Sequence, residues 1–197
     1  MYVLAGMAAL GTDAPSGVTR LVLAPDDLVV VAGIPGAGKS TLLHEADNRA
    51  DAVIVDSEQV GDRLAELAPG WVPYRWYRPL VHLVHRWRIF VAALRSSAPV
   101  VAHLPATRWR TRLLLVVIGM LARRTRRLLW ISVDPDVAYR GQVERGRVSP
   151  PRSFARHVRD ARSVERTLRD SGGLPGWHAA RLLRRPRRGT RFVLLPG

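Results

Sequence analysis

The sequence predicts a three-layer α/β fold, in which a mostly parallel sheet carries helices on both faces. Two observations support this prediction. Short apolar runs alternate with longer helical stretches along most of the chain. One of these runs leads directly into a glycine-rich loop and then a helical stretch, with the sequence Gly33-Ile34-Pro35-Gly36-Ala37-Gly38-Lys39-Ser40-Thr41. In sheets of this class, ligands bind at the carboxyl ends of the strands.

The expected strands are short and apolar, as is typical of strands that are buried on both faces. Residues 1–20 have no clear period, and we expect a loosely structured lead-in there. The predicted strands are Leu21–Leu23, Leu28–Ala32, Ala52–Val55, Pro99–Ala102, Leu128–Val133 and Phe192–Leu195. The basic stretch 181–189 is expected to be a tail before the last strand.

Helices are expected between these strands. Their approximate ranges are 40–48, 57–67, 80–96, 107–124, 135–146 and 152–169. Asp134 suits the N-cap of the fifth helix and Pro135 its first position. Residues 71–79 are expected to be irregular because prolines bracket them. The run 113–122 is too short to span a bilayer and predicts a buried helix.

The glycine-rich segment matches the phosphate-binding pattern G-x-x-x-x-G-K-[ST]. Glycines let backbone N–H groups converge on a phosphate, and the following helix offers its N-terminus to the same anion. Lys39 is the only lysine among the 31 Lys and Arg residues, and it stands where the pattern requires one. The expected nucleotide-binding residues are Gly33, Pro35, Gly36, Ala37, Gly38, Lys39, Ser40 and Thr41, with the Ser40 hydroxyl as a Mg²⁺ ligand.

Composition narrows the class of protein. A length of 197 residues predicts one domain, 1–197, and the absence of cysteine excludes disulfides and thiolate metal sites. We expect a cytoplasmic protein without a targeting segment or a membrane partner. The formal net charge of +15 makes nucleic acid a candidate partner, although a general preference for arginine explains the charge equally well. The oligomeric state is left open.

Asp56 ends the second predicted core strand and is the first candidate for chemistry beyond the loop. Its carboxylate could accept a proton from a substrate hydroxyl or hold Mg²⁺. A structural alternative is a helix cap, because Gln59 follows three residues later.

Two basic segments supply further candidates. Arg140 and Arg145 follow the fourth core strand, where they could close over phosphates as a lid of about 138–152, or be solvated helix residues. Trp71 to Arg78 interleaves aromatics with arginines, and Trp76 and Arg78 could contact a planar, anionic substrate. The histidines at 82, 85 and 103 lack the spacing of a metal site.

Taken together, the glycine-rich loop with its flanking strand and helix, Asp56, Arg63 and the arginines after Asp134 resemble the P-loop kinases. The nearest branch is the predicted small kinases labelled AAA-family ATPases, akin to polynucleotide 5′-hydroxyl kinases and zeta-toxin-like kinases. The resemblance spans about residues 28–170 and implies a three-layer P-loop NTPase fold that binds ATP and Mg²⁺. It also implies that Asp56 activates the acceptor hydroxyl, that Arg63 holds the acceptor and that Arg140 and Arg145 form the lid.

Two departures qualify this resemblance. The third core strand ends in His103, where many P-loop proteins have an aspartate that supports Mg²⁺. No guanine-reading N-K-x-D sequence is present, which disfavours a Ras-type GTPase. We therefore expect transfer of the γ-phosphoryl group of ATP·Mg²⁺ to a hydroxyl of an unidentified acceptor. The alternatives are a nucleotide-binding regulator or slow ATPase, and a nucleic-acid-end kinase or polyanion binder.

Overall fold

The computed structural model describes residues 18–56, 74–146, 148–185 and 191–197, without the side chains of 74–79. Its elements are β1 (Val18–Leu23), β2 (Asp27–Ala32), α1 (Lys39–His44), β3 (Asp47–Asn48), β4 (Val53–Val55), α3 (Tyr74–Arg95), β5 (Val100–His103), α4 (Trp109–Leu121), β6 (Thr125–Ser132), α5 (Pro135–Glu144), α6 (Pro151–Ser171), β7 (Ala179–Arg184) and β8 (Arg191–Pro196).

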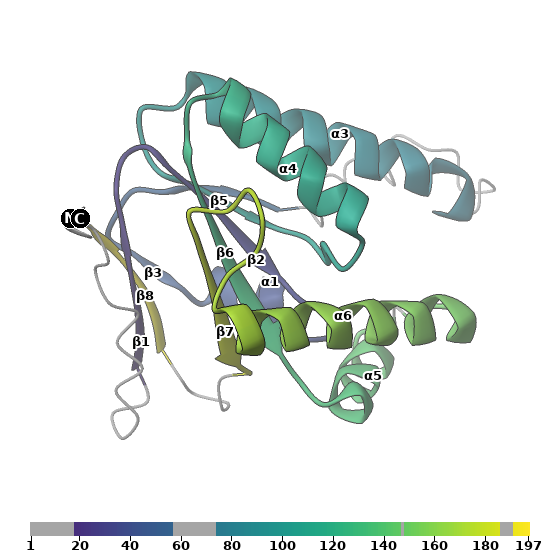
Figure 1. Cartoon of the computed structure of the whole chain (residues 1–197). Helices are drawn as coiled ribbons and strands as arrows, with labels where there is room; N and C mark the ends of the chain where they lie inside the picture. Colours follow the sequence, from purple (N-terminus) through teal and green to yellow (C-terminus); the bar gives the residue numbers. More distant parts are fainter. Residues whose placement is uncertain (1–17, 57–73, 147, 186–190) are drawn as a thin grey trace.

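Five strands form the main sheet, in the order β4-β5-β2-β6-β7, and all neighbouring pairs are parallel. Helices α3 and α4 lie on one side of this sheet, and α5 and α6 lie on the other (Figure 1). This arrangement confirms the predicted α/β fold class. Because the strands are parallel, the carboxyl ends of β2, β4 and β5 lie at one edge of the sheet.

A second, three-stranded sheet has the order β1-β8-β3, with parallel pairing on both sides of β8. The two strands nearest the chain ends thus hold each other, with Val18 opposite Arg191 and Leu23 opposite Pro196. Apolar residues of this sheet, including Leu21 and Phe192, belong to the same buried cluster as the main sheet.

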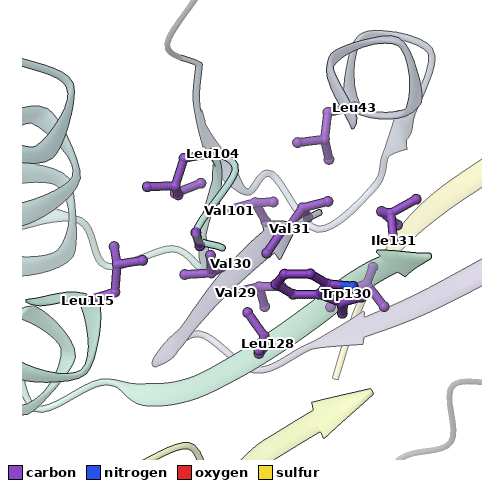
Figure 2. Close-up of a cluster of buried hydrophobic side chains, with 14 of the residues drawn as sticks. Val29, Val30, Val31, Leu43, Val101, Leu104, Leu115, Leu128, Trp130 and Ile131 are labelled. Carbon is purple, nitrogen blue, oxygen red and sulfur yellow. The ribbon is translucent and has the colours of Figure 1, made fainter. Parts of the chain in front are cut away.

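The core is centred on β2, which is buried along its whole length. Valines of β2 pack with Trp130 and Leu128 of β6, while Leu115 of α4 and Leu43 of α1 approach from the helices (Figure 2). Buried Trp130 also donates its indole N–H to Glu165 Oε1 at 3.1 Å, which ties β6 to α6. A near-continuous apolar strand is what a position covered on both faces requires.

Several predicted boundaries were wrong. Helix α1 ends at His44, and α3 begins at Tyr74, so Tyr74–Pro79 is helical and not irregular. Pro79 removes only one backbone donor, and the face of α3 that is buried further along the helix outweighs that loss. The first four residues of the expected basic tail, 181–184, belong instead to strand β7, which pairs with β6 through its backbone.

The run 113–122 is also only partly buried, contrary to the prediction. Leu115 is fully buried, whereas Leu113 is 52% exposed and Leu121 is 64% exposed. Within the described residues, no helix has the length and apolar character needed to cross a membrane.

Two leucines of α4, Leu113 and Leu115, offer a matched test of the core. Leu115→Ala should lower the free energy of unfolding by about 2–5 kcal/mol, because it leaves a cavity against the sheet. Leu113→Ala, the same change two residues away, should lower it by less than about 0.5 kcal/mol. Denaturant unfolding of both variants measures the difference, and equal effects would contradict this packing of α4.

Candidate functional site

The phosphate-binding loop, Gly33–Thr41, joins the carboxyl end of β2 to α1. Three of its glycines have positive φ angles, 145° at Gly33, 86° at Gly36 and 87° at Gly38. A side chain at any of these positions would be strained, so the sequence pattern reflects a backbone requirement. The Gly33 N–H also donates to Pro105 O at 3.2 Å, which fixes the loop against the segment after β5.

Helix α5 lies directly against this loop. A Cβ atom added at Gly36 would lie 2.0 Å from the carbonyl oxygen of Ala138, and one at Gly141 would lie 3.1 Å from that of Gly36. Buried Gln142 donates through Nε2 to Pro35 O at 3.2 Å, and its Oε1 accepts from Ser149 N at 2.9 Å. Gln142 therefore connects the loop to the segment between α5 and α6.

Lys39 closes the loop on itself. Its ammonium donates to Gly33 O at 3.0 Å and to Ile34 O at 2.9 Å, and the residue is 7% exposed. The carbonyls at the start of the loop thus hold the cation at the position from which it could meet a phosphate. Ser40, the next residue, is also buried.

A cavity of about 170 Å³ opens over the loop. Its described lining consists of Pro35, Gly36, Gly38, Lys39, Ser40, His103, Pro105, Gly141, Gln142 and Arg145. This lining contains two cationic side chains and, among the described residues, no carboxylate. Backbone amides, an ammonium, a guanidinium and a hydroxyl are the groups that bind a phosphate chain with Mg²⁺. These residues therefore fit the phosphate chain of a nucleoside triphosphate.

Asp56 lies beside this cavity, at the end of β4, and is only 2% exposed. Its Oδ1 atom accepts from Nε2 of His103 at 2.5 Å, and its Oδ2 atom accepts from Nε2 of His44 at 3.0 Å. A carboxylate only accepts hydrogen bonds, so both imidazoles carry a proton on Nε2. Of this group, His103 is the member that lines the cavity.

His85 of α3, which is 2% exposed, is a second buried histidine near Asp56 and His103. Burial lowers its pKa from 6.5 to about 4, because the charged form loses its hydration. Coulombic interaction with His103 lowers the pKa of His85 further, while the charge of Asp56 acts in the opposite direction. His85 is therefore neutral in the folded protein near neutral pH.

The other predicted site residues are more scattered. Arg145 lines the cavity and donates through Nε to Gly141 O at 3.2 Å, whereas Arg140 is exposed on α5 and is not among the described lining residues. Trp76 and Arg78 lie in the first turns of α3, but their side chains are outside the described part, and Arg63 lies outside the described residues altogether.

The structure adds residues that the sequence did not single out. Arg185 follows β7 and stands by the loop, because a Cβ at Gly38 would lie 3.5 Å from its Nε atom. The backbone N–H of Arg185 donates to the carbonyl oxygen of Ser132, the last residue of β6, at 2.8 Å. In a chain with 30 arginines, sequence alone gives no signal for Arg185, Gln142 or His44.

No group of three or more His, Asp or Glu side chains in the described residues could hold a metal ion by itself.

The chain is similar to known proteins in sequence pattern and in fold. A family model described as an AAA domain matches residues 28–171. A candidate kinase from Chloroflexus aurantiacus j-10-fl is 14% identical over 81% of this chain and 85% of that one, with a TM-score of 0.56, which shows a shared fold. A tunicamycin resistance protein from Deinococcus radiodurans is 14% identical over 79% of this chain and 85% of that one, with a TM-score of 0.46. A gluconokinase from Sinorhizobium meliloti 1021 is 16% identical over 84% of this chain and 86% of that one, with a TM-score of 0.43. Among curated proteins, none matches significantly.

Gly36 offers a test of the contact between the loop and α5. Gly36→Ala should lower the free energy of unfolding by about 1–3 kcal/mol more than Gly146→Ala, because its new methyl group would overlap the Ala138 carbonyl. Gly146 also has a positive φ, 63°, so it shares the backbone strain, but no atom of the described residues lies within 4 Å of its added Cβ. If the two variants unfold at the same denaturant concentration, α5 does not pack against the loop as described.

The lowered pKa of His85 leads us to expect a specific pH dependence of the free energy of unfolding. Its pKa is about 4 in the folded protein and 6.5 in the unfolded chain, so between these values the unfolded chain binds more protons. Stability is therefore lost as pH falls from 6.5 to 4, by up to about 3 kcal/mol from this group. His85→Leu should flatten that part of the curve, as measured by urea unfolding at a series of pH values. His82→Leu, an exposed change in the same helix, should not. Parallel curves for His85→Leu and the native chain would contradict the prediction.

Proposed function

The chain belongs to the AAA domain family, and we propose that it is a phosphotransferase that moves the γ-phosphoryl group of ATP·Mg²⁺ to an acceptor hydroxyl. One observation carries this proposal. The phosphate-binding loop, with buried Lys39, opens into a cavity whose wall includes His103, and His103 holds a buried carboxylate, Asp56. A cation for phosphate and a carboxylate for a proton are the two groups that such a transfer requires.

The loop binds the nucleotide. Backbone N–H groups of residues 33–41 and the ammonium of Lys39 bind the β- and γ-phosphates, and Ser40 Oγ is a ligand of Mg²⁺. When bound, Mg²⁺ neutralises charge on the phosphates. For Lys39 to reach them, its hydrogen bonds to Gly33 O and Ile34 O must be exchanged for bonds to phosphate oxygens.

Asp56 accepts the proton from the acceptor hydroxyl. The acceptor oxygen forms a bond to the γ-phosphorus, the bond from that phosphorus to the bridging oxygen of ADP breaks, and the hydroxyl proton moves to Asp56. His103 is a positioning residue, since it is buried and holds Oδ1. His44 has a side chain that is 59% exposed, so its bond to Oδ2 is the easier one to displace. Oδ2 is therefore the oxygen that meets the acceptor, and it could also contact Mg²⁺.

Arginines stabilise the charge that develops on the transferred group. Arg145 already lines the cavity, and Arg140 belongs to the same proposed lid of about 138–152. Arg185 lies near Gly38 and adds a third guanidinium at the phosphate end. Each of these side chains could donate to phosphate oxygens in the transition state. Arg63, Trp76 and Arg78 are the proposed acceptor contacts.

A second function, an NTP-binding regulator or slow ATPase without an acceptor, is favoured by a different observation. Both oxygens of Asp56 are engaged by histidines, and Asp56 is not among the described residues that line the cavity. If that arrangement persists with nucleotide bound, no acceptor hydroxyl reaches the carboxylate.

Turnover with a pool of hydroxyl-bearing acceptors separates the two functions. The pool should contain sugars, nucleosides and oligonucleotide 5′ ends, and ADP release is the readout. We expect release to depend on acceptor, and Asp56→Asn to lower that rate by about 10²–10⁴-fold, because the general base is lost. Nucleotide affinity, measured by calorimetry, should change little, since Asp56 does not bind the phosphates directly.

Asp134→Asn is the matched control, because Asp134 also follows a strand at this edge, two residues after β6, but caps α5 by accepting from the N–H of Asp136. It should retain acceptor-dependent turnover. ADP release that is slow, independent of every acceptor and unchanged in Asp56→Asn would overturn the phosphotransferase and support the regulator.

A further inference from the structure

Helices α3 and α4 present an apolar surface to solvent on the side opposite the sheet. We call it the α3–α4 face, and its members are the exposed side chains of Leu80, Leu83, Trp87, Leu94, Trp109, Leu113, Leu114, Val117, Met120 and Leu121. Trp87 and Trp109 are each 62% exposed, and Leu121 is 64% exposed. Large apolar side chains gathered in this number on one surface indicate a binding surface rather than scattered surface residues.

Helical periodicity shows that these side chains share one direction. In α3, Val81, His85, Ile89 and Ala93 are buried, and at 100° per residue Leu83, Trp87 and Leu94 lie on the opposite side of the helix. In α4, Leu115 and Ile118 are buried, while Leu113, Val117 and Met120 lie opposite them. The two helices lie side by side on the same side of the main sheet, so their outward stripes adjoin (Figure 1).

The segment of the chain that carries this face has charged side chains of one sign. From residue 67 to residue 133 the sequence has twelve arginines, no lysine and no acidic residue. Exposed arginines lie at both ends of the face, at the end of α3 (Arg95), around the start of α4 (Arg108 and Arg110) and after its last turn (Arg123). Arg110 lies over the ring of Trp109, 5.5 Å from its centroid.

Helix α6 provides the contrast within the same chain. It is also rich in arginine, but acidic residues are interspersed, and Arg169 pairs with Glu165 at 3.1 Å. Its apolar stripe, which includes Ala161, Val164 and Leu168, is buried. Helix α6 therefore has mixed charge outside and apolar residues inside, whereas α3 and α4 have apolar residues on both sides and no acidic residue.

We propose that the α3–α4 face docks on the surface of an anionic lipid bilayer. Exposed Leu and Trp side chains enter the boundary between headgroups and acyl chains, and the arginines at the ends of both helices pair with anionic headgroups. Tryptophan favours this boundary because its ring is apolar and its N–H is polar. The helices lie along the membrane rather than across it, in agreement with the finding that no described helix could span one. This proposal replaces the expectation of no membrane partner.

Charge complementarity selects this occupant over the alternatives. A second copy of the chain would bring an identical cluster of arginines against the first, without carboxylates to pair with them. A nucleic acid would satisfy the arginines but leave the leucines and Met120 in water. An anionic bilayer satisfies both kinds of side chain at once.

Sedimentation with lipid vesicles, without nucleotide, tests the proposal independently of any phosphoryl transfer. Large vesicles of phosphatidylcholine with about 30% phosphatidylglycerol should carry the protein into the pellet. Vesicles of phosphatidylcholine alone should not, and added salt should weaken binding. Equal recovery with both vesicle types, or with neither, would overturn the proposal.

Two pairs of variants locate the contact. Trp87→Ser with Leu113→Ser should weaken vesicle binding roughly tenfold or more, since two apolar anchors are lost. Val143→Ser with Val148→Ser changes side chains that are 54% and 48% exposed on another surface, and should bind as the native chain does. Arg110→Gln with Arg123→Gln should weaken binding about 30-fold, at about fivefold per charge.

The matched charge control is Arg156→Gln with Arg159→Gln, two exposed arginines of α6, which removes the same net charge. If this control weakens binding as much as Arg110→Gln with Arg123→Gln, net charge and not the α3–α4 face is responsible, and the proposal fails. Light scattering of the free proteins adds a further outcome. If the native chain is dimeric and the variant with Trp87→Ser and Leu113→Ser is monomeric, a second copy occupies this face. That result would overturn the lipid proposal.

Discussion

The two hydrogen bonds from Lys39 to the carbonyls of Gly33 and Ile34 are the constraint around which the site is built. They curl the loop back on itself, and its glycines adopt positive φ angles. The loop keeps its place because β2, which leads into it, is buried between β5 and β6. The same bonds keep a buried ammonium solvated by protein oxygens until a phosphate can replace them.

Sheet register explains why a carboxylate and an imidazole meet beside this loop. Val55 of β4 is opposite Ala102 of β5, so the residues that follow them, Asp56 and His103, become neighbours. Val31 of β2 is opposite His103, which brings that pair to the start of the loop. His103, which from sequence looks like a departure from the usual aspartate, thus becomes the partner of Asp56. The chemistry of the site depends on this pairing across strands rather than on the loop alone.

The sequence predicted features that are encoded locally, and missed those that depend on tertiary contacts. The loop and β2 are fixed by glycine positions and by an unbroken apolar run, so both could be recognised directly. Strand β7 could not, because its residues look like part of a basic tail until they pair with β6. Gln142 and Arg185 act through contacts with residues far away in sequence. The run 113–122 misled for a related reason, since hydrophobicity alone cannot distinguish a helix covered by protein from one with an outward apolar face.

The most direct test of the central claim is a crystal structure of the protein with Mg²⁺ and a non-hydrolysable ATP analogue. We expect that Nζ of Lys39 leaves the two loop carbonyls and lies about 3 Å from β- and γ-phosphate oxygens. We also expect that Asp56 Oδ2 faces the γ-phosphate across a space that fits one hydroxyl, with His103 still bound to Oδ1. A nucleotide bound away from the loop, or a γ-phosphate that Asp56 cannot approach because both histidines remain in place, would contradict this claim.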